Sequence, residues 1–371
     1  MSRVVVAGYY GFGNTGDEAL LTAMVDALRA ELPGVDLVVL SAHPEATRQA
    51  LGVEAVDRWS LPAVRRALAG ADLFISGGGS LLQDATSFRS LLYYAGLILW
   101  AHRLGRPVMI YANGIGPLRT RLARRLAREA LAAATRVTVR DSGSLHLLHQ
   151  LAPEVAARAE LTSDPAVALE PLEPAPARAL RSELGLGGGP LALFCVRPWR
   201  PSPRSEEAVA RTADHLAEQG LEVAFVPMQL PGDLAAARSI AARCRRPVRL
   251  VERLLPPRAF ASLVGQADLL VAMRLHALIL AFARRVPSVG LAYDPKVEGF
   301  LRDVRLPTLG PWEALEAEPL IAAVDTLLDR REETVAALEE RLARALPLAR
   351  RNAVIAAQMV GDPARPVSRL G

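Results

Sequence analysis

Arg274 and His276 carry the clearest chemical signal in the sequence, because they stand between two apolar segments of different kinds. Residues 269–273 form an apolar run typical of a buried strand, and the segment "ALILAFA" after His276 is typical of a buried helix. A guanidinium can bind a phosphate or carboxylate through two parallel hydrogen bonds. An imidazole titrates near neutral pH and can transfer a proton. The pair therefore predicts an anion-binding site at which a proton moves; a histidine that only caps the helix is the alternative.

Lys296 follows this junction closely and is the single lysine among the 44 lysine and arginine residues of the chain. An ammonium is a compact point charge, whereas a guanidinium is a planar fork. We therefore expect Lys296 to occupy a site that needs the compact charge. Chance survival in an arginine-rich sequence is the alternative.

Two further arginines end predicted strands, Arg140 in "RVTVR" and Arg197 in "LALFCVR". Ligands of open α/β sheets bind outside the carboxyl ends of the strands. Together with Arg274 and Lys296, these residues predict a set of cations at one topological level, contributed by both halves of the chain. Such a set would suit a small ligand that carries both phosphate and carboxylate. For any one arginine, an ordinary surface charge is the alternative.

A glycine-rich segment, "GYYGFGNTGDEAL", follows the first predicted strand and opens a helix. Its glycines satisfy the G-x-G-x-x-G pattern of dinucleotide sites. However, Asp17 and Glu18 stand at the helix start, where a pyrophosphate needs positive potential, and the next predicted strand ends without a carboxylate that could hold a ribose. We expect either a tight turn or a loop in which Asn14, Thr15 and Asp17 hydrogen-bond a neutral sugar.

A second glycine cluster, "SGGGSLLQD" at residues 76–84, also ends a predicted strand. Glycines such as Gly78 and Gly79 allow backbone N–H groups to approach a ligand closely. Asp84 is expected either as a carboxylate that faces the ligand or as a solvated residue.

Short apolar runs alternate with helical patterns along most of the chain. The predicted strands lie in "RVVVAG", "DLVVLSA", "DLFISGGG", "PVMIYANG", "RVTVRDS", "LALFCVRP", "EVAFVPMQ", "DLLVAM" and "PSVGLAY". Runs that are apolar on both faces and separated by helices indicate parallel sheets covered on both sides. The predicted class is α/β, doubly wound.

A change in composition divides the chain. Residues 165–190 contain five prolines and a glycine triplet, which predicts a linker between two α/β domains. We expect an N-terminal domain at 1–172, a linker at 173–189 and a C-terminal domain at 190–345. Residues 346–371 are expected to form a helical tail.

Composition excludes several classes of protein. The chain has 371 residues, a net charge of +5 and 51% hydrophobic residues. This mild basic balance favours anionic ligands, but no basic block alternates with aromatics as in nucleic-acid-binding surfaces. Cys195 and Cys244 lack metal or disulfide spacing, so a reducing cytoplasm is expected and no metal site. The longest apolar stretch, at 91–101, is too short to span a bilayer; a buried helix is expected there, and an interfacial membrane contact is the alternative.

Several of these segments together resemble the polysaccharide pyruvyl transferases, in particular the CsaB type of bacterial cell-wall polymer synthesis. The matching motifs are "GYYGFGNTGDEALL", "SGGGSLLQD", "YANGIGPL", "VRDSGS", "VPMQ" and "MRLHALILA", which extend to about residue 300. The resemblance implies a glycosyltransferase type B-like fold of two Rossmann-like domains facing a cleft, with the acceptor on the N-terminal side and phosphoenolpyruvate on the C-terminal side.

The resemblance also implies an activity. A pyruvyl unit would pass from phosphoenolpyruvate to a sugar as a cyclic ketal, with release of phosphate. The implied acceptor is N-acetylmannosamine, ketalised at O4 and O6, in a lipid-diphosphate-linked precursor, which would bring the cytoplasmic protein into peripheral contact with the membrane surface. Phosphoenolpyruvate is a co-substrate, and no cofactor or metal is expected.

Site residues follow from the resemblance and from their positions at strand ends. His276, Asp84 and Arg274 are the expected catalytic residues, with His276 as the acid that protonates C3 and Asp84 as the base for a sugar hydroxyl. The remaining assignments are phosphoenolpyruvate binding by Arg140, Arg274, His276, Lys296 and Arg197, and acceptor binding by Asn14, Thr15, Asp17, Gly78 and Gly79.

Three other functions fit parts of the pattern. A nucleotide-sugar-dependent glycosyltransferase of the same architecture would also place cations at the site, but it would release a nucleoside diphosphate instead of phosphate. A non-catalytic glycan-binding module would bind acceptor without turnover. A dehydrogenase is disfavoured by the acidic helix start described above.

Overall fold

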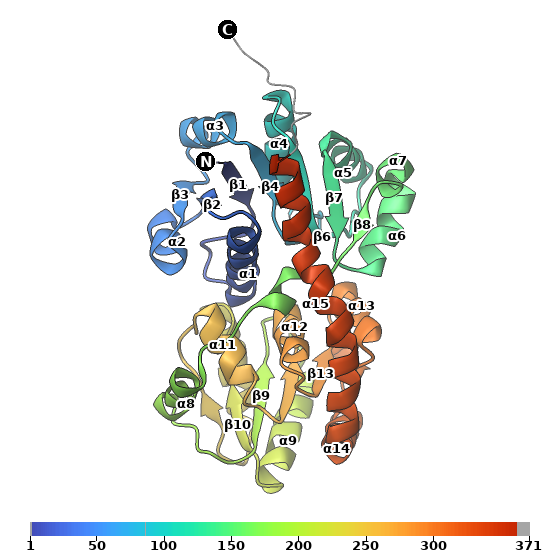
Figure 1. Cartoon of the computed structure of the whole chain (residues 1–371). Coiled ribbons are helices and arrows are strands. Elements are labelled where there is room, and N and C mark those ends of the chain that lie inside the picture. The colour runs from blue at the N-terminus through green and yellow to red at the C-terminus, as the bar shows by residue number, and fades with distance from the viewer. Residues whose placement is uncertain (1, 86, 362–371) are drawn as a thin grey trace. The chain divides into compact units, whose positions relative to one another are not determined.

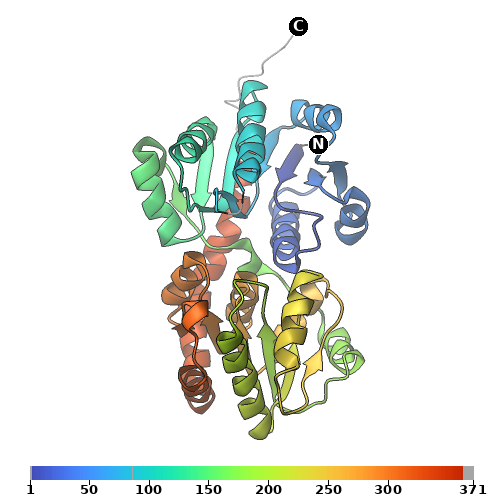
Figure 2. The same ribbon diagram turned by 180° about the vertical axis from the view of Figure 1, so that it is seen from behind.

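The computed structural model describes residues 2–85 and 87–361, which form two compact units. The first unit comprises residues 2–12, 20–168 (apart from 86) and 345–361, and the second comprises 13–19 and 169–344. Most of the first unit is coloured blue to green in Figure 1, and the second runs from green to orange; Figure 2 shows the reverse side.

A parallel sheet forms the centre of the first unit. Its strands are β1 (Arg3–Ala7), β2 (Asp36–Ser41), β3 (Glu54–Asp57), β4 (Leu73–Ser76), β5 (Gly79–Leu82), β6 (Val108–Ile115), β7 (Arg136–Val139) and β8 (Glu160–Leu161). The order is β3-β2-β1-β4-β6-β7-β8, with β5 paired to β6. The helices of this unit are α1 (Thr15–Glu31, whose first turn belongs to the second unit), α2 (Pro44–Leu51), α3 (Leu61–Ala69), α4 (Phe88–Arg103), α5 (Arg121–Ala133), α6 (Ser142–Leu151), α7 (Pro153–Ala156) and the 3-10 turn η1 (Pro165–Ala168).

Strand β1 shows why the sheet is apolar on both faces. Val4 and Val6 pack in one core, which also contains residues of α1 and the end of α15 (Arg331–Gly361), whereas Val5 and Ala7 pack in the core on the other side. Successive side chains of a strand point to opposite faces. A strand covered on both sides must therefore be apolar at every position.

A second parallel sheet forms the centre of the second unit. Its strands are β9 (Leu191–Cys195), β10 (Glu222–Phe225), β11 (Arg249–Leu250), β12 (Leu269–Ala272), β13 (Ser288–Leu291) and β14 (Thr308–Leu309), in the order β11-β10-β9-β12-β13-β14. The helices are α8 (Pro174–Glu183), α9 (Pro203–Glu218), α10 (Gly232–Ala241), α11 (Pro257–Val264), α12 (Leu275–Ala283), α13 (Pro295–Val304), η2 (Trp312–Ala314), α14 (Ala317–Asp329) and the first part of α15.

The predicted α/β class is confirmed, and each of the nine predicted strand segments contains a strand. Residues 174–183, inside the expected linker, form helix α8. Residues 346–361 of the expected tail continue α15 and contribute Ala353, Ile355 and Ala356 to the first unit's core; the rest of that tail lies outside the described residues. The apolar stretch at 91–101 lies in α4 and buries Leu91, among others. Of the helices in the described residues, none is long and apolar enough to cross a bilayer.

Asn352 fixes the end of α15 within the first unit. Its side-chain oxygen accepts hydrogen bonds from Thr138 Oγ1 at 2.6 Å and Thr162 Oγ1 at 3.0 Å, and its nitrogen donates to the Ser163 carbonyl at 3.3 Å. The side chain is fully buried. Buried polar groups need partners, so this cluster specifies one position of the helix against β7.

Candidate functional site

Three neighbouring strands of the second unit bring the predicted cations to one edge of the sheet. Strands β9, β12 and β13 lie side by side and are parallel. Arg197 follows β9, Arg274 and His276 follow β12, and Lys296 follows β13. Adjacent strands are about 4.8 Å apart, so the sheet order itself assembles this set, which we call the strand-end site.

Arg274 is held by a buried carboxylate. Its Nε donates to Asp233 Oδ2 at 3.0 Å and its Nη2 donates to Oδ1, while Nη2 also reaches Gln229 Oε1 at 3.3 Å. Asp233 is 1% exposed and accepts further bonds from the backbone N–H groups of Met228 and Gln229. Asp233 therefore neutralises the charge of Arg274 and occupies the Nε and Nη2 side of the guanidinium. The Nη1 group can then donate to a ligand.

His276 lies in the first turn of α12, and its ring is packed against Gly16. A methyl group added at Gly16 would stand 2.4 Å from His276 Nδ1 and 2.7 Å from His276 Cγ. Separations below 3.0 Å are not seen for real Cβ atoms. Both residues belong to the second unit. The last glycine of the G-x-G-x-x-G segment is thus required by the imidazole.

Arg197 is the strand-end arginine whose charge no carboxylate neutralises in the described part of the chain. Its Nη1 donates to Tyr293 Oη at 3.0 Å, and its guanidinium lies 5.0 Å from the Tyr293 ring and 5.9 Å from that of Trp199. The two rings meet edge to face at 4.9 Å. The aromatic residues orient the guanidinium through cation–π contacts and leave its charge available for an anion.

Lys296 is more accessible than the arginines. Its side chain is 37% exposed, and Nζ lies 3.5 Å from Asp294 Oδ2. Asp294 caps α13 by accepting a hydrogen bond from the Lys296 backbone N–H at 3.0 Å. An exposed pair of this kind contributes about 0–1 kcal/mol to stability, so the ammonium can exchange Asp294 for a ligand anion at little cost.

Arg140 lies in the first unit and is buried beside two polar partners. Its Nη1 donates to Asp164 Oδ2 at 2.7 Å and its Nη2 donates to Ser80 Oγ at 3.1 Å. The Arg140 side chain is 5% exposed and that of Asp164 is 6% exposed. A Cβ at Gly114 would stand 3.1 Å from Nη2, so this glycine makes room for the guanidinium. The grouping of Arg140 with the cations of the second unit stays a prediction.

Asp84 anchors a loop of the first unit. Its carboxylate accepts hydrogen bonds from the backbone N–H groups of Arg119 at 2.7 Å and Thr120 at 3.0 Å, and from the Thr120 hydroxyl at 3.2 Å. Burial alone would raise the pKa of Asp84, but these hydrogen bonds together lower it below the ordinary value. A carboxylate with a lowered pKa is a weaker base, so the geometry favours a structural role for Asp84 over the predicted base.

The loop residues expected to bind an acceptor are used within the fold. Asn14 Oδ1 accepts from the Gly16 N–H at 3.0 Å, and Thr15, which is 3% exposed, directs its hydroxyl to the Leu255 carbonyl at 3.4 Å. Asp17 is in the first turn of α1. These bonds account for the "NTG" segment as a helix start.

The second glycine cluster is explained largely by internal packing. A Cβ at Gly77 would stand 2.3 Å from Tyr10 Oη, and one at Gly78 would stand 2.9 Å from Leu20 Cδ2. Gly79 opens β5 with a φ of 93°, a conformation that favours glycine. Close approach to a ligand is therefore not needed to account for Gly77 and Gly78.

A match to a protein-family model decides the family. The model of the polysaccharide pyruvyl transferases matches residues 14–295. The chain belongs to the polysaccharide pyruvyl transferase family. The matched range contains three of the four residues of the strand-end site, and Lys296 is the next residue after the range ends.

Solved structures similar to this pyruvyl transferase family member share its whole fold. A Staphylococcus aureus MnaA–UDP structure has a TM-score of 0.65 at 11% identity and covers 95% of this chain and 94% of its own. The structure of Neisseria meningitidis UDP-GlcNAc 2-epimerase bound to UDP-GlcNAc has a TM-score of 0.65 at 12% identity and covers 97% of this chain and 99% of its own. The structure of Anabaena Alr3699/HepE in complex with UDP-glucose has a TM-score of 0.64 at 14% identity and covers 97% of this chain and 98% of its own. No curated protein sequence matches the chain significantly. The neighbours confirm the predicted glycosyltransferase type B-like α/β fold.

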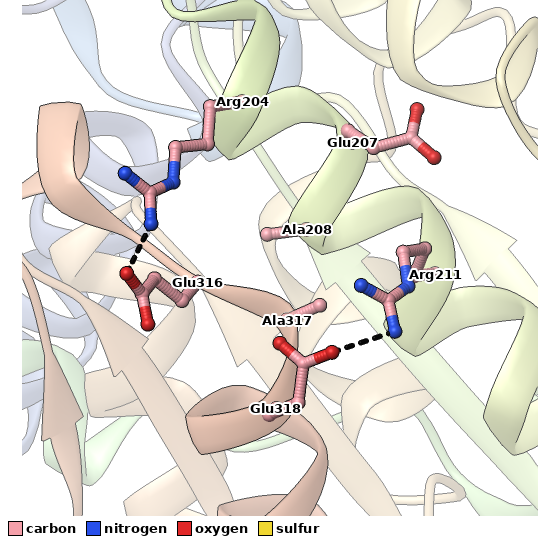
Figure 3. Close-up of a pocket in the computed structure, with 7 residues that line it drawn as sticks. All are labelled: Arg204, Glu207, Ala208, Arg211, Glu316, Ala317 and Glu318. Carbon is pink, nitrogen blue, oxygen red and sulfur yellow. Dashed lines mark hydrogen bonds and ion pairs between the residues drawn. The ribbon is translucent and has the colours of Figure 1, made fainter.

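A surface pocket of about 260 Å³ lies between α9 and α14. Figure 3 shows Arg204 directed at Glu316 and Arg211 directed at Glu318, each joined by an ion pair. Ligand pockets usually measure roughly 300–1,000 Å³, and no strand-end residue lines this one. Among residues 2–85 and 87–361, no group of His, Cys, Asp and Glu is arranged to hold a metal ion.

The sequence did not indicate three residues that contact the arginines of the strand-end site. Asp233 was not singled out, although it stands in the first turn of a helix that follows a strand. Trp199 and Tyr293 follow β9 and β13 within four residues, so their strand-end position was the available signal. All three act on the arginines and define which guanidinium edges remain accessible.

Proposed function

We propose that this pyruvyl transferase family member uses phosphoenolpyruvate to form a pyruvate ketal on a sugar and releases phosphate. The observation that carries the proposal is the strand-end site, in which Arg197, Arg274, His276 and Lys296 occupy the carboxyl edge of three adjacent strands. Phosphoenolpyruvate carries a phosphate and a carboxylate, and the site offers cations of different shapes for two such groups.

Each cation has a distinct task in this proposal. Arg197 carries the charge that no carboxylate neutralises in the described part of the chain, so it is assigned to the phosphate. Lys296 can leave Asp294, which lies 3.5 Å away, and contact the same group. Arg274 contributes the donor hydrogens of Nη1, while Asp233 keeps the guanidinium from rotating. Arg140 is assigned to phosphoenolpyruvate on the sequence resemblance alone.

The chemistry begins with protonation of C3 of phosphoenolpyruvate by His276. C2 then develops oxocarbenium character, and a sugar hydroxyl forms a C–O bond to it. The bond between C2 and the bridging oxygen breaks, and phosphate leaves with the electron pair. The second hydroxyl closes the ketal. Two hydroxyl protons are released: one restores His276, and the other ends on the departing phosphate. The reaction as written needs no cofactor.

The acceptor is proposed from the CsaB resemblance of the sequence motifs. It is N-acetylmannosamine in a lipid-diphosphate-linked cell-wall precursor, ketalised at O4 and O6. An acceptor of this kind would bring the cytoplasmic protein to the inner face of the membrane as a peripheral enzyme.

Phosphate release tests the activity. The expected result is phosphate formation from phosphoenolpyruvate only when a glycan acceptor is present, together with a higher Tm in phosphoenolpyruvate but not in NADH, since a ligand of the native state stabilises it. Release of UDP from a UDP-sugar, without phosphate from phosphoenolpyruvate, would establish the glycosyltransferase alternative.

Histidine variants provide the matched comparison. His276→Ala is expected to lower turnover roughly 10²–10⁴-fold, the usual contribution of a general acid. His215→Ala is the control, because His215 on α9 pairs with Asp325 at 2.8 Å and lies outside the site. Equal turnover of the two folded variants would remove His276 from the chemistry.

A further inference from the structure

Arg58 in the first unit lies among aromatic rings. It follows β3 and is 3% exposed. Its guanidinium carbon lies 4.4 Å from the ring centre of Tyr93, 4.9 Å from that of Phe12, 5.0 Å from that of Trp59 and 5.4 Å from that of Tyr94. Contacts below about 6 Å are attractive cation–π interactions and are strongest when the cation is shielded from water.

The polar bonds of Arg58 fix this cluster further. Nη1 donates to the Gly8 carbonyl at 2.8 Å and Nη2 donates to Tyr94 Oη at 3.2 Å, while Tyr93 Oη donates to the Arg58 carbonyl at 3.2 Å. Within the described residues, Arg58 forms no ion pair with a carboxylate. The rings therefore supply much of what stabilises the buried charge, and the charge in turn holds the rings in place.

Trp59 is held by this cluster and yet exposed. Its ring lies 5.4 Å from that of Tyr93, but 61% of the residue is accessible to solvent. The rings of Tyr9 and Phe12 stack on each other, with 4.2 Å between their centroids and an interplanar angle of 11°. The Phe12 ring of this pair also contacts Arg58. An exposed aromatic that is already ordered loses little conformational entropy when it binds a ligand. Contiguous exposed apolar surface marks a binding site, and the Trp59 ring adjoins the Tyr93 ring of this cluster.

The position of the cluster agrees with a ligand site. Tyr9 and Phe12 lie in the loop after β1, and Trp59 follows β3, so these rings stand at the carboxyl edge of the first unit's sheet. Ligands of open α/β sheets bind at this edge. The cation of Arg58 is covered by the rings, so the surface offered to a ligand is aromatic and uncharged. This favours the C–H-bearing face of a pyranose over a phosphate group.

We propose that Trp59, supported by Arg58 and Tyr93, is a stacking platform for a pyranose ring of the acceptor glycan. The identity of that glycan as the acceptor rests on the proposed function, whereas the binding of a sugar ring by Trp59 does not. The site deepens the proposed function because it gives the first unit a specific contact with the acceptor glycan. The contact is either with the sugar that receives the ketal or with the adjacent sugar of the same glycan.

Kinetics of single variants test the platform. Trp59→Ala is expected to raise the acceptor KM about 10-fold or more, the scale of one lost aromatic contact, with kcat and the phosphoenolpyruvate KM within about twofold of wild type. Trp59→Phe keeps a ring and is expected to restore most of the affinity. Leu61→Ala is the control, because Leu61 is 66% exposed nearby and has no ring.

The acceptor is offered in two forms, lipid-linked and as the lipid-free glycan diphosphate. An equal KM increase for both forms in Trp59→Ala supports sugar stacking. An increase confined to the lipid-linked form would overturn it in favour of a lipid contact, and an unchanged KM would overturn it outright. A parallel rise in the phosphoenolpyruvate KM or a large fall in Tm would show a structural role instead.

Fluorescence separates this inference from the proposed function. Trp59 is one of four tryptophans, and subtracting the Trp59→Phe signal from that of wild type isolates its emission. Titration with the lipid-free glycan, without phosphoenolpyruvate, is expected to quench this difference signal. Quenching without any turnover would support the platform and refute the proposed reaction. Turnover with neither quenching nor a change in the acceptor KM would support the reaction and refute the platform. UDP alone should leave the signal unchanged, and quenching by UDP would identify a nucleobase platform.

Discussion

Gly16→Ala is the most direct perturbation of His276 that leaves the histidine in place. The added Cβ would stand 2.4 Å from Nδ1, whereas ordinary contacts begin at 3.4 Å. The imidazole must therefore move by about 1 Å, and a displacement of that size near reacting groups can lower the rate about 10²-fold. Overpacking costs about 1–3 kcal/mol, but alanine gains about 1 kcal/mol over glycine in a helix, so the stability should change little.

Phosphate release under saturating phosphoenolpyruvate measures the effect. Gly96→Ala is the matched control, because Gly96 lies inside α4 and a Cβ there meets no atom within 4 Å. The double variant Gly16→Ala/His276→Ala should be no slower than His276→Ala alone, since both changes act through one group. Wild-type turnover in Gly16→Ala, or additive losses in the double variant, would refute the reasoning.

Three further predictions concern polar side chains that are held by hydrogen bonds. Asp233→Asn leaves Arg274 buried without its counter-charge and should lower the free energy of unfolding by about 3–5 kcal/mol. Wild-type stability of this variant in a urea titration would contradict the role of Asp233 in neutralising Arg274. Asp84 has a pKa lowered by folding, so its ionised form stabilises the protein above its unfolded pKa of about 3.9. The stability difference between wild type and Asp84→Asn should then shrink as pH falls below about 4, and a difference that grows on acidification would show the opposite sign. Asn352→Leu removes the acceptor shared by Thr138 Oγ1 and Thr162 Oγ1, which keep the backbone carbonyls of Ile110 at 3.2 Å and Val139 at 3.3 Å as partners. Losing two buried hydrogen bonds at about 0.5–1.5 kcal/mol each should lower the free energy of unfolding in chemical denaturation by about 1–3 kcal/mol, and an unchanged value would show that the carbonyls replace Asn352 fully.

The sequence was informative where a single segment contains the whole signal. Parallel strands buried on both faces appear as continuous apolar runs, which is why β1 and β12 could be predicted from their own residues. Strands β8, β11 and β14 have two residues each and were missed, because so short a run has no periodicity. Strands β3 and β5 were missed as well: of the four residues of β3 only Ala55 is buried, and β5 follows the glycines that end β4. These strands exist because a longer neighbour provides hydrogen-bond partners.

The site shows a similar limit at the level of side chains. The positions of Arg274 and Lys296 at strand ends followed from the sequence. The ion pair between Arg274 and Asp233 did not, since Asp233 comes from a different strand–helix connection. Gly16 illustrates the same point: the spacing of glycines was visible, whereas the imidazole that requires it lies far along the chain. Partners that are brought together by topology have no local signature.

The composition of the first unit has a consequence for synthesis on the ribosome. Residues 345–361 supply Ile355 and Asn352 to a unit whose other elements are complete at residue 168. At about 5–20 residues per second, the end of α15 emerges roughly 10–40 s after that point. Throughout this interval the nascent first unit displays the apolar surface that Ala353, Ile355 and Ala356 later cover. The last stretch of translation therefore acts as the closing step of the first unit, and a ribosome that stalls before it would present a binding surface to chaperones.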